Sequence, residues 1–368
     1  MGLVPQEALV GQVLDDRYRV LACIGAGGVG EVYSARMLKL DRPVAVKVLH
    51  ERFVANAEFV ARFRREVKAI SRLHHPHCVA VLDHGVVQSR PYLVFEYLEG
   101  QTLARVVRQD GAMAPERAVG IVLQVLDALA YFHGQSVVHR DLKSENIMLV
   151  QAGTTREFAK VLDFGMAKLL DQEPGESQLS MRGVVSGTLT AMAPEQIQQL
   201  SPDSRIDIYA TGILLYELIV GHRPFRAREP KDVARMQLTA RPRPPRALLG
   251  EAALSAELEH VILKALEKDR ADRFPSAQEM ADALLRTPEG ARGPARPSGD
   301  TPAPPDEITV LDSLLADAEP VPSPSSAVEI TEISPPGFAT PLERPWFLLG
   351  TLVLLGALTA LVWLRLAS

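Results

Sequence analysis

The stretch Val137-Val-His-Arg-Asp-Leu-Lys-Ser-Glu-Asn-Ile-Met-Leu-Val150 concentrates polar side chains between two short apolar runs, and Val161-Leu-Asp-Phe-Gly165 follows shortly after it. Within these stretches Asp141 is a candidate general base, because a carboxylate can accept the proton of a hydroxyl. Asn146 and Asp163 offer the amide and carboxylate oxygens that Mg²⁺ prefers in proteins. Together, the two stretches therefore predict a metal-assisted catalytic site. Taken singly, each residue would be interpreted as an ordinary polar residue of the surface.

A glycine-rich segment near the N-terminus predicts a second part of this site. Gly25-Ala-Gly-Gly-Val-Gly-Glu-Val32 has the pattern G-x-G-x-x-G-x-V, and glycines allow a backbone to approach phosphate oxygens closely. Dinucleotide-binding turns share part of this pattern, but they require a helix that opens at the glycines. Here residues 31–36 and 43–49 both read as strands, so we expect a strand–glycine–strand hairpin over ATP rather than NAD, with Lys47 beneath it.

A helix over residues 57–73 is predicted by apolar residues at steps of four and three (Phe59, Phe63, Val67 and Ile70). Glu66 lies beside that face, 19 residues after Lys47. A lone glutamate on such a helix is most often solvated, but a phosphate-binding lysine needs an anionic partner that orients it.

The order of the motifs resembles the protein-kinase superfamily: the glycine loop, Val-Ala-Val-Lys47, His-Arg-Asp141-Leu-x-x-x-Asn146, Asp163-Phe-Gly and Ala-Pro-Glu195. Lys143, two residues after Asp141, resembles the serine/threonine branch. The sequences of the segments GGVGEVY, MAPEQ and DIYATGILLYEL are similar to those of bacterial Hanks-type (eukaryotic-like), membrane-anchored serine/threonine kinases. The resemblance covers about residues 18–286.

This resemblance implies roles for individual residues. Asp141 would accept the proton of the substrate hydroxyl, Lys143 would contact the γ-phosphate, and Asn146 with Asp163 would hold Mg²⁺, with Mn²⁺ as a possible substitute. Lys47 would bind the α- and β-phosphates while Glu66 orients it. Phe95 would lie behind the adenine, and the backbone of the following residues would bond it. The ATP-binding residues implied are Ile24, Gly25, Ala26, Gly27, Gly28, Val29, Gly30, Glu31, Val32, Ala45, Lys47, Glu66, Phe95, Glu96 and Leu98.

The resemblance also implies regulatory and structural roles. Arg140 would be neutralised by a phosphate on the activation segment, for which Ser180 is the first choice, while Thr188 belongs to the substrate-docking loop. Ala191 stands where relatives usually carry tyrosine, which puts the shape of that loop in doubt. Glu195 and Arg273 resemble the buried ion pair of the large lobe, and have no part in the chemistry.

The fold class expected is α+β, a two-lobed protein-kinase-like fold with a small antiparallel-sheet lobe carrying one helix (about 18–97) and a mainly helical lobe (about 98–286). Residues 1–17 read as an N-terminal extension. Residues 287–345 read as a disordered linker, because they hold 13 of the 27 prolines and 10 acidic residues against 3 arginines. Within it, residues 306–315 have the apolar spacing of a short amphipathic helix, and whether this patch docks on the kinase stays open.

Residues 346–364 form an uncharged apolar run of 19 residues, roughly 28 Å long as a helix. Tryptophans at both ends favour a transmembrane helix over a buried core helix, and residues 365–368 form a short tail. We therefore expect a single-pass protein of the cell (inner or plasma) membrane with a cytoplasmic kinase domain. Gly356 and Ala360 hint weakly at a homodimer, which stays unresolved.

Composition narrows the possible partners. With 40 basic and 45 acidic residues the formal charge is −5, so nothing favours a nucleic-acid partner. The two cysteines, Cys23 and Cys78, cannot build a disulfide framework, which fits a reducing compartment. The expected partners are protein substrates with serine or threonine acceptors. The alternative from another class is an ATP-binding pseudokinase that acts as a membrane scaffold.

Overall fold

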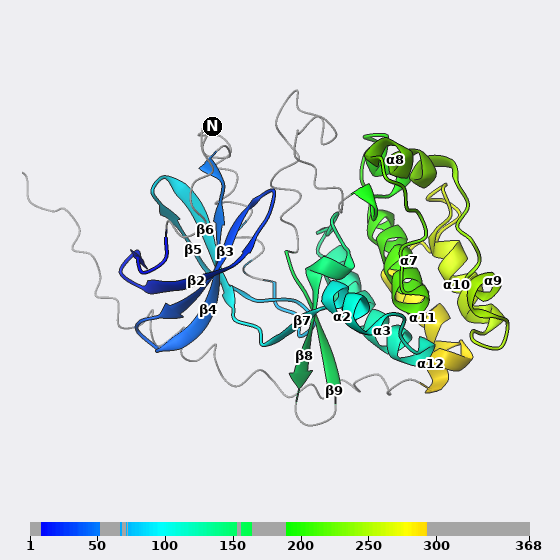
Figure 1. Cartoon of the computed structure of the whole chain (residues 1–368), viewed down its shortest axis with the longest axis horizontal. Helices are drawn as coiled ribbons and strands as arrows, with labels where there is room; N and C mark the ends of the chain where they lie inside the picture. Colours follow the sequence, from blue (N-terminus) through cyan, green and yellow to red (C-terminus); the bar gives the residue numbers. More distant parts are fainter. Residues whose placement is uncertain are drawn as a thin grey trace, which may run out of the picture. The chain divides into compact units, whose positions relative to one another are not determined.

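The computed structural model describes residues 9–51, 67, 71, 73–152, 156–163 and 189–292. All of them belong to one compact unit. This unit consists of a sheet-based part, shown in blue to cyan, and a mainly helical part, shown in cyan through green to yellow (Figure 1).

The sheet-based part is a six-stranded antiparallel sheet with the strand order β1-β2-β3-β4-β6-β5. Its core consists of side chains that alternate along the strands and are fully buried, such as Tyr33, Val44, Val46, Tyr92 and Val94. Alternation of this kind is what a sheet with one covered face requires. The strands are β1 (Val13–Leu14), β2 (Tyr18–Ala26), β3 (Gly30–Met37), β4 (Arg42–Leu49), β5 (Val81–Val87) and β6 (Arg90–Glu96).

The residues just before Tyr18 belong to this sheet, although the sequence analysis assigns them to an extension. Strand β1 pairs with β2, and Leu9 is fully buried in the same core. The carboxylate of Asp15 accepts a hydrogen bond from the hydroxyl of Tyr92. The described part of the extension therefore covers the outer edge of the sheet.

A second, three-stranded sheet lies in the helical part. It contains β7 (Gly100–Thr102), β8 (Ile147–Ala152) and β9 (Arg156–Val161). Strand β9 also joins this part to the chain that enters β5, because Val79 N donates to Val161 O (3.0 Å) and Val161 N donates to His77 O (2.9 Å). The end of β9 is thereby fixed from both sides.

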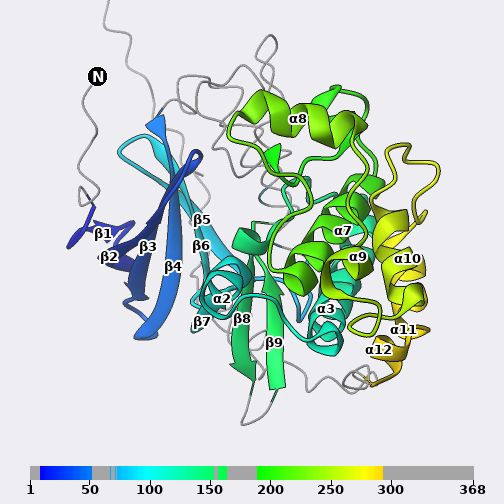
Figure 2. The same cartoon turned by 45° about the vertical axis from the view of Figure 1, so that its right-hand side comes forward.

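The helices pack around α7 (Arg205–Val220), which is buried on nearly all faces, as expected for an apolar helix at the centre of a domain. It contacts α3 (Pro115–Gly134), which also packs against β9 (Figure 2). The other helices are α2 (Leu103–Asp110), the 3₁₀ helix η2 (Ser144–Asn146), α6 (Pro194–Ile197), α8 (Pro230–Thr239), α9 (Pro245–Leu249), α10 (Ala256–Ala265), α11 (Ala277–Leu285) and α12 (Pro288–Arg292).

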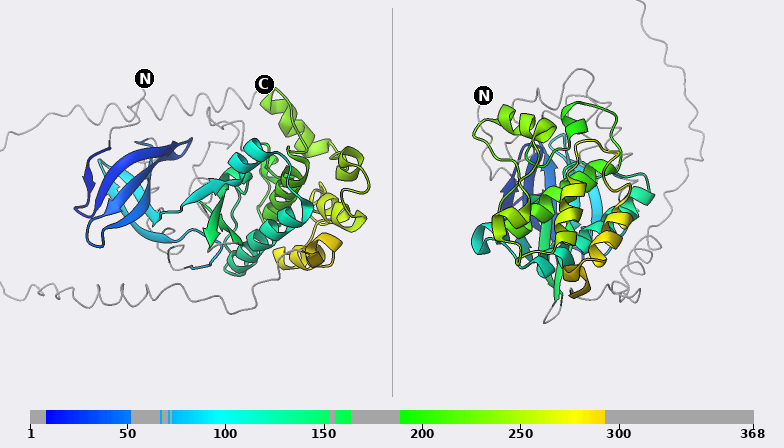
Figure 3. Two further views of the ribbon diagram at one scale, coloured as in Figure 1. Left: turned by 60° about the horizontal axis from the view of Figure 1, so that its bottom comes forward. Right: turned by 90° about the vertical axis from the view of Figure 1, so that its right-hand side faces the viewer.

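The folded domain continues beyond the predicted start of the linker at Thr287, which corrects that boundary. Residues 288–292 form α12, which packs against α3 and α11 (Figure 3). The buried carboxylate of Glu289 accepts hydrogen bonds from Ser255 N (2.8 Å) and Ser255 Oγ (2.7 Å). Pro288 is compatible with this helix, since proline is favoured in the first turn of a helix.

The predicted two-lobed α+β architecture is confirmed. The helix expected over residues 57–73 falls almost wholly outside the described residues, as do the rest of the linker and the apolar run 346–364. Among the helices of the described ranges, none has the length and apolar character needed to cross a bilayer.

Candidate active site

The glycine-rich segment forms the turn between β2 and β3, as predicted. Gly27 N donates to Gly30 O (2.9 Å), and Gly25 pairs with Val32 on the opposite strand. Gly30 lies so close to β4 that a Cβ atom there would overlap the carbonyl of Val48. The hairpin is thus a tight strand–turn–strand, with no helix opening at the glycines.

Glu31, one of the predicted ATP-binding residues, directs its carboxylate into the sheet-based part. It accepts hydrogen bonds from Arg90 Nη2 (2.7 Å) and Tyr33 OH (3.1 Å), and only 10 % of its side chain is exposed. Arg90 Nε also donates to Leu49 O (2.8 Å). The side chain of Glu31 therefore fastens the base of the glycine hairpin, and a nucleotide beside Glu31 would meet its backbone.

The predicted adenine-side residues lie on adjacent strands. Ala45 on β4 is the cross-strand partner of Phe95 on β6, and Phe95 is 7 % exposed. Val29, from the glycine turn, packs against the same small cluster. These residues form one apolar patch beneath the hairpin.

The chain that leaves β6 connects the two parts of the domain. Glu96 N donates to Ala80 O (3.1 Å), and the Glu96 carboxylate binds Ala80 N (2.9 Å) and Lys160 Nζ (2.7 Å). A ligand at Glu96 would therefore meet its main chain rather than its carboxylate. Leu98, which follows it, is half-buried.

Lys47 and Asp163 form an ion pair, with Lys47 Nζ 2.6 Å from Asp163 Oδ2. Burial by itself would raise the pKa of the Asp163 carboxyl, but Lys47, with smaller contributions from His139 and Lys143, holds that pKa below its ordinary value. The lysine of the sheet-based part thus meets the carboxylate of the helical part. The predicted partner of Lys47, Glu66, lies outside the described residues.

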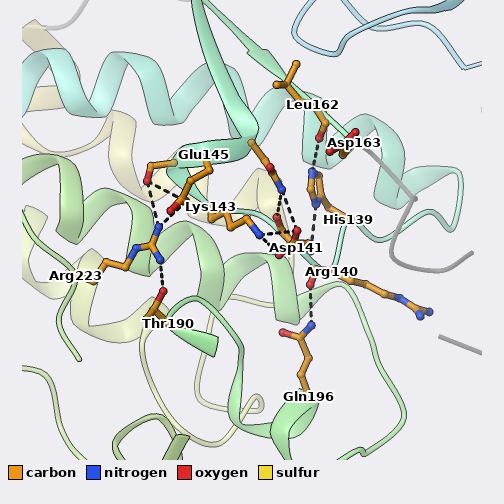
Figure 4. Close-up of polar contacts among 12 residues, drawn as sticks. His139, Arg140, Asp141, Lys143, Glu145, Leu162, Asp163, Thr190, Gln196 and Arg223 are labelled. Carbon is orange, nitrogen blue, oxygen red and sulfur yellow. Dashed lines mark hydrogen bonds and ion pairs between the residues drawn. The ribbon is translucent and has the colours of Figure 1, made fainter. Parts of the chain in front are cut away.

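The side chains of the catalytic loop converge on Asp141 (Figure 4). Lys143 Nζ lies 2.8 Å from each Asp141 carboxylate oxygen. Asn146 Nδ2 donates to Asp141 O (2.8 Å) and to Asp141 Oδ2 (3.1 Å). The carboxylate is therefore paired with a cation, oriented by an amide and only partly exposed.

The β8–β9 hairpin brings the two predicted metal ligands to one place. Ile147 pairs with Val161, and Leu162 N donates to Asn146 O (2.8 Å). Asn146 and Asp163 thus sit at the same open end of the hairpin, although 17 positions separate them.

His139 ties the catalytic loop to the residue before Asp163. Its Nδ1 accepts a hydrogen bond from Asp141 N (3.2 Å), and its Nε2 lies 2.8 Å from Leu162 O (Figure 4). Because Nδ1 acts as an acceptor and a carbonyl needs a donor, the arrangement assigns the proton to Nε2. His139 is fully buried, so this link is shielded from water.

Asp207 is a functional residue that the sequence analysis missed. Its fully buried carboxylate accepts hydrogen bonds from His139 N (2.8 Å), Arg140 N (2.9 Å) and His133 Nε2 (2.8 Å). Burial would raise the pKa of this carboxyl, but the bond from His133 and the other donors keep it below the ordinary value. An acid within a mostly apolar helix is the signal that could have revealed it, since a buried charge needs donors.

Two residues of the site have backbones in the left-handed region, Arg140 (φ 68°) and Asp163 (φ 56°). Such conformations cost energy in residues other than glycine and persist only where neighbours hold them. Asp207 holds the N–H of Arg140, and Gln196 Nε2 donates to its carbonyl (2.8 Å). The Arg140 side chain extends away from the Asp141 cluster (Figure 4).

The metal prediction rests on one amide and one carboxylate. Within the described ranges no group of three or more His, Cys, Asp or Glu residues could hold a metal ion by itself. Asn146 uses its Nδ2 for Asp141, which leaves its oxygen as the natural metal donor. This pair suits Mg²⁺, which commonly binds a few protein oxygens together with substrate phosphates.

The Glu195–Arg273 pair has the structural role that the resemblance implies. Arg273 Nη1 and Nη2 bind the two Glu195 oxygens at 2.7 and 2.8 Å, with side chains that are 0 % and 5 % exposed. The pair fastens the start of α6 to the loop before α11. Neither side chain contacts Asp141 or Asp163 in the bonds described here. The predicted regulatory residues Ser180 and Thr188 lie outside the described residues.

The protein kinase domain family matches residues 18–285. The chain is 42 % identical over 270 residues to the serine/threonine-protein kinase pkn3 of Myxococcus xanthus, covering 73 % of this chain and 49 % of that protein. It is 38 % identical over 281 residues to the serine/threonine-protein kinase PknB of Mycobacterium tuberculosis, covering 75 % and 44 %, respectively. The chain thus spans less than half the length of these two relatives.

A similar solved structure is the kinase domain of PknI from Mycobacterium tuberculosis, determined as a double mutant. It superposes with a TM-score of 0.60 at 27 % identity, covering 75 % of this chain and 98 % of that one. With the motif residues brought together in the order and geometry described above, the chain belongs to the protein kinase family, in its serine/threonine branch.

Proposed function

We propose that this protein transfers the γ-phosphate of ATP to serine and threonine hydroxyls of protein substrates. The observation that carries the proposal is the Asp141 carboxylate, held by Lys143 and Asn146 next to the hairpin end that bears Asp163. Phosphoryl transfer depends on positioning and charge neutralisation more than on covalent chemistry, and these residues supply both.

In the proposed reaction the substrate hydroxyl oxygen attacks the γ-phosphorus. The bond from that phosphorus to the bridging oxygen of ADP breaks, and the hydroxyl proton passes to Asp141 and then to solvent. Lys143, already beside Asp141, would neutralise charge on the transferring group. Lys47 would bind the α- and β-phosphates under the glycine hairpin.

Asn146 and Asp163 would hold a divalent cation, Mg²⁺ or Mn²⁺. When bound, the cation neutralises charge on the phosphates. Lys47 is already paired with Asp163, so the lysine that would bind the phosphates and the carboxylate that would bind the cation lie side by side.

The proposal is tested by incorporation of labelled phosphate from ATP into casein and into the protein itself. Wild-type protein should transfer phosphate, and Asp141→Asn should lower turnover by a factor of ~10²–10⁴ while ATP still binds. The exposed Asp110→Asn is the matched control and should keep wild-type turnover. The pseudokinase alternative is not favoured, because the phosphate- and metal-binding positions that the structure describes all carry suitable side chains. ATP binding without transfer in the wild type would reverse that judgement.

We also propose that the apolar run 346–364 anchors the kinase domain at the cytoplasmic face of the cell membrane. The support is its length, its lack of charge and its terminal tryptophans. A protein that ends at Arg344 should be recovered without detergent and keep its kinase activity. Full-length protein in the soluble fraction, without detergent, would contradict the anchor.

A phosphate on Ser180, paired with Arg140, remains our proposal for activation. The support is the place of Arg140 directly before Asp141, with a backbone that Asp207 and Gln196 fix. Mass spectrometry of active protein should find the modification between Ser177 and Ser186. An unmodified stretch in fully active protein would remove the proposal.

A further inference from the structure

Arg223 lies in the turn after α7, and its side chain connects several segments of the active-site region. No motif in the sequence indicates this role. Its side chain is 10 % exposed. Its Nη2 donates to Glu145 Oε2 (2.6 Å) and Ser144 Oγ (3.3 Å), and its Nε donates to Glu217 Oε1 (3.2 Å). Its Nη1 donates to the hydroxyl of Thr190 (Figure 4).

These partners come from three different segments. Ser144 and Glu145 stand between the catalytic-loop residues Lys143 and Asn146. Glu217 lies in the last turn of α7, and Thr190 lies in the segment that leads to Ala193-Pro-Glu195. A guanidinium presents its N–H groups in a rigid planar fork, so a single arginine can bind all three segments at once.

The segment around Thr190 depends on such fastening. The next residue, Ala191, is 6 % exposed and carries only a methyl group, so its own side chain can form no hydrogen bond that holds the segment. Besides Arg223, the bonds on Thr190 include one from Gln237 Nε2 to its carbonyl (2.9 Å). Gln237 is fully buried and its Oε1 accepts from Tyr209 OH (2.5 Å), so α8 and Arg223 hold this segment from two sides.

Arg223 also compensates the negative charges of its two carboxylate partners, Glu145 and Glu217. Burial raises the pKa of the Glu217 carboxyl, and the guanidinium of Arg223 opposes that rise. Glu145 is 43 % exposed, so solvent screens part of its charge. Without Arg223, burial and the nearby Glu145 would raise the pKa of Glu217 with less opposition.

We propose that Arg223 is a positioning residue for phosphoryl transfer, which holds the catalytic loop and the substrate-docking segment in register. The inference rests on the proposed kinase function. Arg223 acts through Ser144, Glu145 and Thr190, and it touches neither Asp141 nor Lys47 in the bonds described. Its loss should therefore lower kcat and leave ATP affinity unchanged.

The test compares wild type, Arg223→Ala, Arg223→Lys and Thr190→Val as full-length proteins. Phosphate transfer to casein gives kcat and KM, and a fluorescent ATP analogue gives nucleotide affinity. Arg223→Ala should lose about 10- to 100-fold in kcat, the size of a misplaced reacting group. Arg223→Lys keeps the charge without the fork and should retain only part of the kcat. Thr190→Val removes the hydroxyl that Arg223 binds and should show the smallest loss.

Two controls separate positioning from a general loss of structure. Arg226→Ala removes an exposed arginine from the same turn and should keep wild-type kcat. Low-millimolar ethylguanidinium should restore part of the kcat of Arg223→Ala, while sodium chloride at equal ionic strength should not. A destabilised protein would gain nothing from ethylguanidinium.

A wild-type kcat in Arg223→Ala would overturn the inference, as would a fall in ATP affinity as large as the fall in kcat. A wild type that transfers no phosphate would contradict the proposed function instead. Hydrogen–deuterium exchange decides the positioning role independently of activity: residues 144–146 should exchange faster in Arg223→Ala than in wild type. Equal exchange there would overturn the inference even for an inactive enzyme.

Discussion

Lys47 Nζ lies 2.6 Å from Asp163 Oδ2, which joins strand β4 of the six-stranded sheet to the end of β9 in the helical part. The two residues are 116 positions apart. The two opposite charges therefore stabilise each other. The pair also links the lysine expected to bind phosphate with the carboxylate expected to bind the metal ion.

Replacing Lys47 should consequently change more than phosphate binding. In Lys47→Met the pKa of Asp163 should rise, because burial then acts without the cation that opposes it. Since Asp163 works as a carboxylate, the acid limb of the kcat/KM profile for ATP should move to higher pH, in addition to an overall loss of rate. The exposed Lys39→Met is the matched control. An unshifted acid limb in Lys47→Met would show that the pair does not set the ionisation of Asp163.

Asp207 should be as important for stability as for activity. Asp207→Asn puts an amide NH₂ among three N–H donors, so at least one donor loses its acceptor. An unsatisfied buried polar group costs about 1–3 kcal/mol, so the free energy of unfolding should fall by at least that amount. Turnover should fall as well, because the backbone before Asp141 is released. The partly exposed Asp203→Asn, measured by the same chemical denaturation, should change stability much less.

The same substitution has a signature in the pH dependence of stability. The folded-state pKa of Asp207 is lowered, so its contribution is complete above the pKa of an unfolded aspartate and is lost as the pH falls through the folded-state value. Wild type should therefore lose more stability than Asp207→Asn between neutral and acidic pH. Melting temperatures measured over that range would show it; parallel curves for the two proteins would contradict the assignment.

The sequence predicts the residues of the site better than it predicts what holds them. Asp141, Lys143, Asn146 and Asp163 are found because each stands in a short motif whose spacing is fixed by a loop or a hairpin. Asp207 is missed because its contacts to residues 139–140 span 67 or more positions, a distance at which spacing carries no information.

Two further details of the structure could not be predicted from the sequence, for specific physical reasons. The pattern of the glycine loop does not indicate where the side chain of Glu31 points, and in the structure it pairs with Arg90. Pro288 and Gly290 read as linker residues by composition, but proline suits the first turn of a helix and Gly290 fits where a Cβ atom would overlap the carbonyl of Leu284. Local preference and local packing, rather than composition, decided both outcomes.

The Glu195–Arg273 pair should behave as a buried pair in a double-mutant cycle. Arg273→Met leaves a carboxylate that is 5 % exposed without its partner, and removal of one member of such a pair costs about 3–5 kcal/mol. Replacement of both residues by Arg273→Met and Glu195→Leu should cost less than the sum of the single changes. Arg235→Ala breaks the exposed pair with Asp232 and should cost no more than about 1 kcal/mol, since exposed pairs contribute little. Additive single and double changes at Glu195 and Arg273 would show that the two side chains are not coupled.

The C-terminal limit of the folded domain gives a last prediction, which depends on Glu289. Its carboxylate binds both the N–H and the hydroxyl of Ser255, the residue that caps α10. Thr287 is also buried, and its hydroxyl donates to Leu284 O (2.7 Å) and accepts from Gly290 N (3.0 Å). A protein that ends at Arg292 should therefore be more stable than one that ends at Arg286.

Within the longer protein, Glu289→Ala alone should lower the free energy of unfolding by about 1.5–3 kcal/mol, the contribution of hydrogen bonds to a charged group. Glu257 is an exposed glutamate in the first turn of α10, so Glu257→Ala is the matched control. It should lower the free energy of unfolding by only a few tenths of the effect of Glu289→Ala. Denaturation in urea measures both effects with one method. Equal midpoints for the proteins ending at Arg286 and Arg292 would place residues 287–292 outside the cooperative fold, and would return the domain boundary to Arg286, where the composition of the sequence puts it.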